Sequence, residues 1–453
     1  MNSTKKKLII QITNLCLSSF LLVACRNTYK KKTSSFSSSD FSSSSEKSEL
    51  SFEEEEYFNE LPTFSFNVDG EIPDRSDPEY KNYASCGISF SNGANTITDE
   101  EGKIRIRGTS SRWFPKKGYK IKFSSKTELL DLSKSKKYNL LASYLDPTLL
   151  RDYLAMSISY SMNNNSKRWA PKIRLCKVNI NDDYQGLYYL IDDIADGKEK
   201  IRLDDYSSSD ENIPFILEMD TIADRQDEKK YFALGETDVF DYDGDGKTAL
   251  YYKVDTPEDV ADIQLHNIEL FMTNCREYLE QKNLFGFVNN VDVFSFIDFF
   301  LLAELFRNTD LVGRSTYMYR LSTEGKLIFG PSWDFDYTCS RPYSMEPNTD
   351  YNLENAKDRF YNYDWWKLFL EIEGTDKLIY ERYVNYFKPI VEYHLQEMNI
   401  HYDFYKNEII SNGNIWYGKY DVNELIEDNH KWTNDYFALR MEMMDDTFNK
   451  YKE

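Results

Sequence analysis

Residues 291–306 are apolar almost without interruption and are long enough for about four turns of helix. A helix without a polar face has to be covered on every side, so the chain needs a large core or a membrane around it. Asp298 and Glu304 lie within the stretch and favour burial in protein over burial in lipid. The predicted helix leads directly to Asn308 and Asp310.

Three carboxylates then follow in two short loops. Asp310 stands in Asn-Thr-Asp, whereas Asp334 and Asp336 stand in the segment Gly-Pro-Ser-Trp-Asp-Phe-Asp, and about one β-hairpin of sequence (residues 315–329) separates them. Bringing such charges together is costly unless a cation neutralises them, which predicts a magnesium-dependent site. An aspartate followed about 25 residues later by Asp-x-Asp is the order that protein kinases use. Loop aspartates also serve as turn formers and helix caps, and that alternative stays open.

Basic residues close to a turn of small residues are candidates for contacts with phosphate. Lys116 and Lys117 lie beside a tryptophan and a proline, and Arg107 precedes the turn Gly-Thr-Ser-Ser. Lys120 and Lys122 alternate along a predicted strand, as a solvated strand face would.

The N-terminal sequence predicts that the protein is exported from the cytoplasm. Residues 1–25 have a basic start, an apolar run and the ending Leu-Val-Ala-Cys, which resembles a bacterial lipobox with lipid attachment at Cys25. The alternative, a transmembrane anchor, is disfavoured because the run is shorter than about 20 residues and contains polar residues. We therefore expect an exported lipoprotein, anchored by acyl chains such as palmitate to the outer face of a bacterial cytoplasmic membrane.

Residues 26–60 are rich in serine with scattered acids and predict a flexible tether. The formal net charge of −21 argues against nucleic acid as a partner. Four cysteines follow at widely spaced positions without a CxxC pair, so a zinc site is not expected, and disulfides or isolated buried thiols both remain open. These are Cys86, Cys176, Cys275 and Cys339.

The remaining chain predicts one domain at residues 61–345 and a helical extension at 346–453. Alternation predicts strands within residues 62–123 and at 172–180, 186–191 and 214–220. Asp146-Pro147 and Thr256-Pro257 predict helix starts, with helices to about Met162 and Lys282. Asp241, Asp243 and Asp245 resemble half of an EF-hand loop, but Tyr252 replaces the twelfth-position acid and we do not expect calcium there.

Several segments in the right order resemble the spore-coat-protein-H (CotH) kinase family. Residues 107–111 (Arg-Gly-Thr-Ser-Ser) stand where the family usually has Arg-Gly-Asn-Ser-Thr, and residues 113–123 are similar to its Trp…Pro-Lys-Lys-x-Tyr-Arg-Ile-Lys. The other similar segments are 138–152, 184–188, 214–220 and 330–336. The likeness covers about residues 100–340.

The resemblance implies an α+β, atypical protein-kinase-like fold, with a β-rich N-terminal part and a helical C-terminal part. It implies transfer of the γ-phosphate of ATP to Ser or Thr hydroxyls of proteins, with Mg²⁺ or alternatively Mn²⁺. Carried over by position, the implied roles are catalysis for Asp310 and Asn308, metal binding for Asp334, Asp336 and Ser315, and nucleotide binding for Lys117 or Lys116, Arg107 and Glu218, the last as partner of the lysine.

Two departures from the family pattern bear on these roles. Thr109 replaces the family asparagine, and Ser315 stands where a kinase catalytic loop places a metal-binding asparagine. Serine is a poorer ligand for magnesium, so either a second ion is lost or Asp336 compensates. Asp220 lies two residues from Glu218 and competes for its role.

Two other functions remain as alternatives. The chain can be a catalytically silent surface binding or adhesion module with this fold, since ATP is scarce outside a cell. It can also be a carbohydrate-active enzyme with paired carboxylates. Retention of Asp310, Asp334 and Lys117 together favours the kinase.

Overall fold

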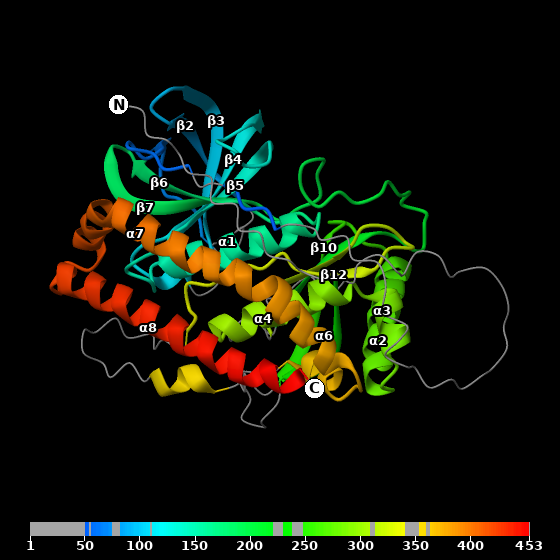
Figure 1. Cartoon of the computed structure of the whole chain (residues 1–453). Coiled ribbons are helices and arrows are strands. Elements are labelled where there is room, and N and C mark those ends of the chain that lie inside the picture. Colours follow the sequence, from blue (N-terminus) through cyan, green and yellow to red (C-terminus); the bar gives the residue numbers. More distant parts are fainter. Residues whose placement is uncertain are drawn as a thin grey trace, which may run out of the picture.

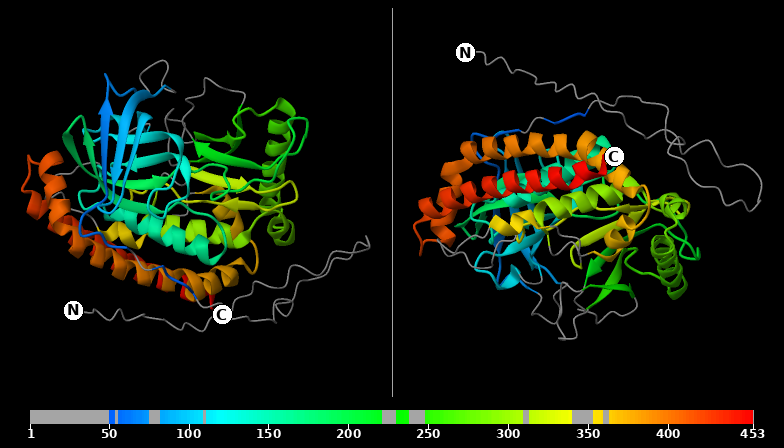
Figure 2. Two further views of the ribbon diagram at one scale, coloured as in Figure 1. Left: turned by 90° about the horizontal axis from the view of Figure 1, so that it is seen from above. Right: turned by 60° about the horizontal axis from the view of Figure 1, so that its bottom comes forward.

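The computed structural model describes residues 50–53, 56–74, 82–108, 111–220, 230–237, 248–308, 313–339, 353–358 and 363–452. This part of the chain is α+β, as predicted. It contains a closed barrel, a second sheet and a set of long helices (Figure 1). Both views in Figure 2 show the long helices gathered on one side of the two β units.

Seven strands close the barrel in the order β1-β2-β3-β4-β5-β7-β6, and β1 pairs in parallel with β6 at the closure. The strands are β1 (Thr63–Val68), β2 (Ala84–Ser91), β3 (Thr96–Arg107), β4 (Gly118–Thr127), β5 (Ser135–Leu141), β6 (Ile173–Ile180) and β7 (Asp183–Asp192). Alternation directs one face of each strand inward, so that Phe64, Ile104 and Ile121 are fully buried in the barrel core. The strands predicted from alternation are therefore confirmed.

The second sheet has the order β12-β11-β8-β10-β9. Its strands are β8 (Phe215–Asp220), β9 (Tyr231–Thr237), β10 (Thr248–Thr256), β11 (Thr316–Arg320) and β12 (Leu327–Phe329). The pairing of β11 with β12 confirms the hairpin predicted between the two acidic loops. Because β10 continues to Thr256, the prediction that a helix starts at this residue is wrong. Helix α2 (Asp262–Glu280) begins later, where the Gln264 side chain accepts a hydrogen bond from the Ala261 main-chain nitrogen at 3.0 Å.

The other α-helices of the described chain are α1 (Leu150–Asn165), α3 (Leu284–Asn290), α4 (Val293–Phe306), α5 (Asp364–Leu370), α6 (Thr375–Arg382), α7 (Lys388–Trp416) and α8 (Val422–Phe448). The prediction of a helical C-terminal part is confirmed. Helix α7 packs on α1, β7 and α8, and α4 packs between α1 and α8. No described helix is long and apolar enough to cross a membrane.

Helix α1 starts later than the Asp-Pro signal predicts. Leu149 adopts a left-handed conformation with φ 61°, so the residues before it form a non-helical turn and the helix begins only at Leu150. Asp146 still acts as a cap, because its carboxylate accepts hydrogen bonds from the main-chain nitrogens of Thr148 and Arg151 at 3.0 and 2.8 Å. The signal therefore identified the capping residue but not the first helical residue.

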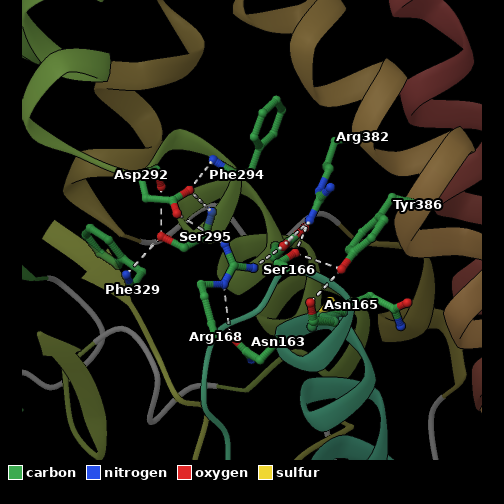
Figure 3. A network of polar contacts seen from close by, with 12 residues as sticks. Asn163, Asn165, Ser166, Arg168, Asp292, Phe294, Ser295, Phe329, Arg382 and Tyr386 are labelled. Carbon is green, nitrogen blue, oxygen red and sulfur yellow. Dashed lines mark hydrogen bonds and ion pairs between the residues drawn. The ribbon is translucent and has the colours of Figure 1, made fainter. Parts of the chain in front are cut away.

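Helix α4 is the predicted apolar helix, and its acidic residues are buried in protein as expected. Asp298 accepts hydrogen bonds from Arg382 Nε at 2.7 Å and from Arg168 Nη2 at 2.8 Å. Figure 3 shows the side chains of Arg168 and Arg382 pointing toward one another. Glu304 is paired with Arg440, whose side chain is fully buried, at 2.9 Å. Both acidic residues in the middle of α4 are thus paired with arginine, which offsets part of the cost of burying their charges.

The predicted tether at residues 26–60 does not lie wholly outside the folded body. The Ser51 main-chain nitrogen donates to the side chain of Asn165 at 2.9 Å, at the end of α1. The ring of Phe52 stacks on Tyr393 of α7 with centroids 4.0 Å apart. Ser51 and Phe52 are therefore part of the folded body, because Phe52 supplies apolar surface that packs on α7.

All four cysteines of the body are buried and unbonded, so the structure favours isolated thiols over disulfides. Burial raises the pKa of each thiol to about 12. These thiols are therefore protonated and unreactive at neutral pH.

Candidate functional site

The end of α4 meets the loop that follows β12. Asn308 is fully buried, and its Nδ2 donates to the main-chain oxygen of Asp334 at 3.0 Å. Asp334 has a left-handed φ of 68°, and its half-buried carboxylate accepts a hydrogen bond from the Ser315 hydroxyl at 3.3 Å. The structure therefore brings together three of the residues predicted for the site: Asn308, Ser315 and Asp334.

A second carboxylate, not assigned from the sequence, lies against the same loop. Asp152 is in the first turn of α1 and accepts hydrogen bonds from the Ser143 hydroxyl at 2.6 Å and from the Phe335 main-chain nitrogen at 2.9 Å. Burial, and then the charge of Asp334, raise its pKa to about 6 against the opposing hydrogen bond from Ser143. The sequence signal for it was an acid at the start of an apolar helix, which also fits a simple helix cap.

Asp336 lies on the other side of the loop, beside a cation. Arg151 is buried and donates to the main-chain oxygen of Thr338 at 3.1 Å. It also pairs with Asp146 at 3.4 Å. Although burial opposes it, the charges of Asp146 and Asp336 raise the pKa of Arg151. A metal ion at Asp336 would have to compete with this guanidinium, so Asp334 is the better placed of the two predicted ligands.

The pKa of Asp152 gives stability a pH dependence of known sign. The folded pKa of about 6 exceeds the ordinary value of 3.8, so stability falls as the pH rises between these values. Because the charge of Asp334 contributes, we expect a smaller fall in Asp334→Asn. Melting temperatures between about pH 4 and pH 7 should diverge in favour of this variant. The control is Asp403→Asn, an exposed position on α7, and parallel curves for both variants would contradict the coupling.

The two lysines predicted to bind nucleotide are both engaged elsewhere. Lys116 is fully buried, and its Nζ donates to the main-chain oxygens of Ala142, at 2.9 Å, and Leu187. Burial lowers the pKa of Lys116 to about 7. Lys117 donates to the main-chain oxygen of Arg112 at 2.5 Å. The structure shows neither lysine in contact with the Asp334 loop.

Arg107, in contrast, reaches that loop. Its guanidinium lies 5.2 Å from the ring centroid of Trp333, the residue before Asp334. Gly108 follows with φ 93°, and a Cβ added there would come within 1.9 Å of the Ser111 hydroxyl oxygen. The turn after β3 therefore requires glycine, and it places Arg107 at the edge of the site.

Lys120 is a basic residue of the site that sequence reasoning treated as solvated. Its Nζ lies 2.8 Å from Asp193 Oδ1, and Asn139 donates to the same oxygen at 3.1 Å. Burial alone would raise the pKa of Asp193, but the charge and hydrogen bond of Lys120 hold it below its usual value. Lys120 is thus a fixed cation on the outer face of the barrel.

Glu218 lies in the second sheet and is paired there, so the predicted pairing with Lys117 is wrong. Its neighbours in register are Lys253 on β10, with Nζ 3.5 Å from its carboxylate, and Tyr317 on β11, whose hydroxyl donates to it at 3.1 Å. Asp255 is a second acidic neighbour of Lys253, whose Nζ lies 3.5 Å from its carboxylate. Burial raises its pKa, and the charges of Glu218 and Lys120 both act on it. The barrel face and the sheet face therefore present charges to one another.

Three sets of residues discussed in the sequence analysis lie outside the described residues. They are Asp310, predicted to be catalytic; Asp241, Asp243 and Asp245, where calcium was not expected; and Cys25, predicted to carry lipid. Among the residues that the structure describes, no group of three or more His, Cys, Asp or Glu side chains is arranged to hold a metal ion.

The fold is a mixed α+β arrangement in which the Asp334 loop is bonded to Asn308 after α4 and to Asp152 on α1, and Arg107 of the barrel lies beside Trp333 of the same loop. A family model described as CotH kinase protein matches residues 104–444, about three quarters of the chain. The chain belongs to the CotH kinase family. The match includes α5 to α7 and most of α8, and a search of curated proteins found no match.

Proposed function

We propose that this chain is an atypical protein kinase that transfers the γ-phosphate of ATP to Ser or Thr hydroxyls of proteins. The observation that carries the proposal is the Asp334 loop, which is held against the end of α4 by Asn308 and against α1 by Asp152. Phosphoryl transfer depends on rigid positioning and on charge stabilisation rather than on covalent chemistry of the protein. A carboxylate fixed by two buried elements meets that need.

The residues fit a magnesium ion. Asp334 offers a half-buried carboxylate that accepts a hydrogen bond of 3.3 Å from the Ser315 hydroxyl, and a neighbouring buried acid has a raised pKa. Mg²⁺ is usually held by one or two carboxylates together with phosphate oxygens and water, so a complete protein cage is not required. When bound, the ion would neutralise phosphate charge. Asp334 would hold it, with Ser315 as the weaker neighbour.

Asp310 is proposed as the group that orients the attacking hydroxyl and accepts its proton. It follows Asn308 by two residues in sequence, and Asn308 is bonded to the Asp334 loop. A catalytic carboxylate in this role must come within hydrogen-bonding reach of the acceptor hydroxyl. The acceptor side chain would have to enter the site from the surface.

For the cation that contacts phosphate, we propose Lys120 with Arg107 in place of Lys117. Lys120 is oriented by Asp193 and stands on the barrel face opposite the second sheet. We expect Lys120→Met to lower kcat/KM for ATP by roughly 100-fold, because a preorganised charge is lost. Lys126→Met, an exposed position on the same strand, is the control. A larger loss in Lys117→Met than in Lys120→Met would contradict this assignment.

We further propose that the chain is exported and held at a membrane by lipid on Cys25, as its N-terminal sequence predicts. Partitioning of the intact chain into a detergent phase tests the anchor. The kinase itself is tested by incubating residues 50–453 with labelled ATP and Mg²⁺ or Mn²⁺. If no label transfers and no nucleotide raises the melting temperature, the silent binding module is the better account.

A further inference from the structure

The outer face of β3, β4 and β5 carries a row of lysines in register. Lys103 on β3 lies directly opposite Lys122 on β4, and Lys122 lies directly opposite Lys137 on β5. Lys103 and Lys137 are exposed and Lys122 is half-exposed. None of the three forms an ion pair with a residue that the structure describes. We call these three residues the lysine row.

Such a row is unfavourable in an isolated sheet. Like charges directly opposite each other on neighbouring strands repel, with their Cβ atoms about 5 Å apart. The chain has 76 acidic and only 55 basic residues, so a group of three facing cations differs from the acidic character of the chain as a whole. An anionic partner would remove this repulsion.

The lysine row is continuous with the candidate site. The next outward-facing positions toward the site are Arg105 and Lys120, which face each other on β3 and β4. Arg107 follows at the end of β3 and contacts Trp333. The outward residues of these strands therefore form a basic track that ends at the Asp334 loop. Four residues of strand separate Lys103 from Arg107, about 13 Å.

We propose that the lysine row binds an acidic, serine-containing polypeptide and so selects the protein substrates of this kinase. The inference rests on the proposed function and adds a substrate class to it. An extended peptide directs alternate side chains to one side about 6.7 Å apart, which is also the spacing of the basic residues along β3 and β4. Acidic side chains at least four positions from the acceptor hydroxyl would then contact the row.

Binding without nucleotide tests the inference separately from catalysis. The protein is the chain from residue 26 onward, and the probe is a fluorescent 16-residue peptide of alternating Ser and Glu. Lys103→Gln, Lys122→Gln and Lys137→Gln together should weaken binding about tenfold and reduce its salt dependence. The matched control replaces three exposed lysines of the C-terminal helices, Lys377, Lys450 and Lys452, by Gln. It changes the net charge equally and should alter the affinity less than twofold.

Three results would overturn the inference: equal weakening in both triple variants, equal or tighter binding of an alternating Ser and Lys peptide, or preferential binding of a single-stranded oligonucleotide. Unchanged melting temperatures in both triple variants exclude unfolding as the cause of a loss. If the peptide binds through the lysine row but no phosphate is transferred from ATP, the substrate-binding surface stands and the kinase proposal fails.

Discussion

Asp334→Asn is expected to lower the rate of phosphoryl transfer by a factor of about 10² to 10³ while the chain remains folded. Asparagine keeps the shape of the side chain and can still accept the Ser315 hydroxyl hydrogen bond, but it removes the charge that would hold Mg²⁺. The main-chain oxygen of this residue continues to accept from Asn308. The loss should therefore appear in kcat and in the dependence on Mg²⁺ concentration, as measured with labelled ATP.

Asp403→Asn on the exposed surface of α7 is the matched control and should leave transfer unchanged. Asp310→Ala should be as inactive as Asp334→Asn, because both groups are proposed to act on the same phosphoryl transfer. Full activity in Asp334→Asn would remove the basis of the catalytic proposal. Activity that is lost together with the melting transition would instead assign Asp334 a purely structural role.

Asp298→Ala is expected to lower the free energy of unfolding by about 3–5 kcal/mol. Asp298 receives both Arg168 and Arg382, and these guanidiniums have side-chain exposures of only 7% and 9%. Removing the carboxylate leaves two nearly buried positive charges without their shared partner (Figure 3). Denaturant titration at 25 °C measures the loss, which comes from uncompensated charge rather than from a cavity alone.

A double variant separates these two causes. Asp298→Ala combined with Arg382→Met removes one of the two arginine charges and should recover part of the lost stability, whereas a cavity effect would not be recovered. Asp376→Ala is the control for loss of an exposed carboxylate on α6 and should change stability by less than about 0.5 kcal/mol. A loss below 1 kcal/mol in Asp298→Ala would show that the two arginines find other partners or water.

The features of the site that could be predicted are those encoded within short segments. The apolar helix that leads to Asn308 and the hairpin before Asp334 both follow from local periodicity and turn residues, and both are present. The contact between Asn308 and Asp334 brings the end of this helix and the loop after the hairpin together, as expected for two elements that follow each other in the chain. Helix starts were predicted less well at Asp146-Pro147 and Thr256-Pro257, because a left-handed turn and an extended strand compete there with the cap signal.

The features that could not be predicted depend on contacts between distant segments. Asp152 contacts the main-chain nitrogen of Phe335, 183 residues away in sequence, and nothing local distinguishes it from a helix cap. Lys116 and Lys120 are only four positions apart in the sequence, yet Lys116 is fully buried whereas Lys120 is a cation held by Asp193 on the outer face of the barrel. Whether a lysine is buried or exposed depends on how the barrel closes, and the sequence of a single strand does not show this.

The docking of Ser51 at the last residue of α1 sets a limit on self-modification. Asp152 and Asn165 stand at opposite ends of α1, about 20 Å apart along the axis, and Asp152 contacts the Asp334 loop. Some six extended residues are needed to cover that length, whereas Ser48 precedes Ser51 by only three positions in the sequence. If the Asp334 loop is the site of transfer, as proposed, we expect no transfer to Ser48 within one molecule. Phosphate found on Ser48 would then have come from a neighbouring molecule. The position of a phosphorylated serine in this stretch would therefore distinguish transfer within one chain from transfer between two chains.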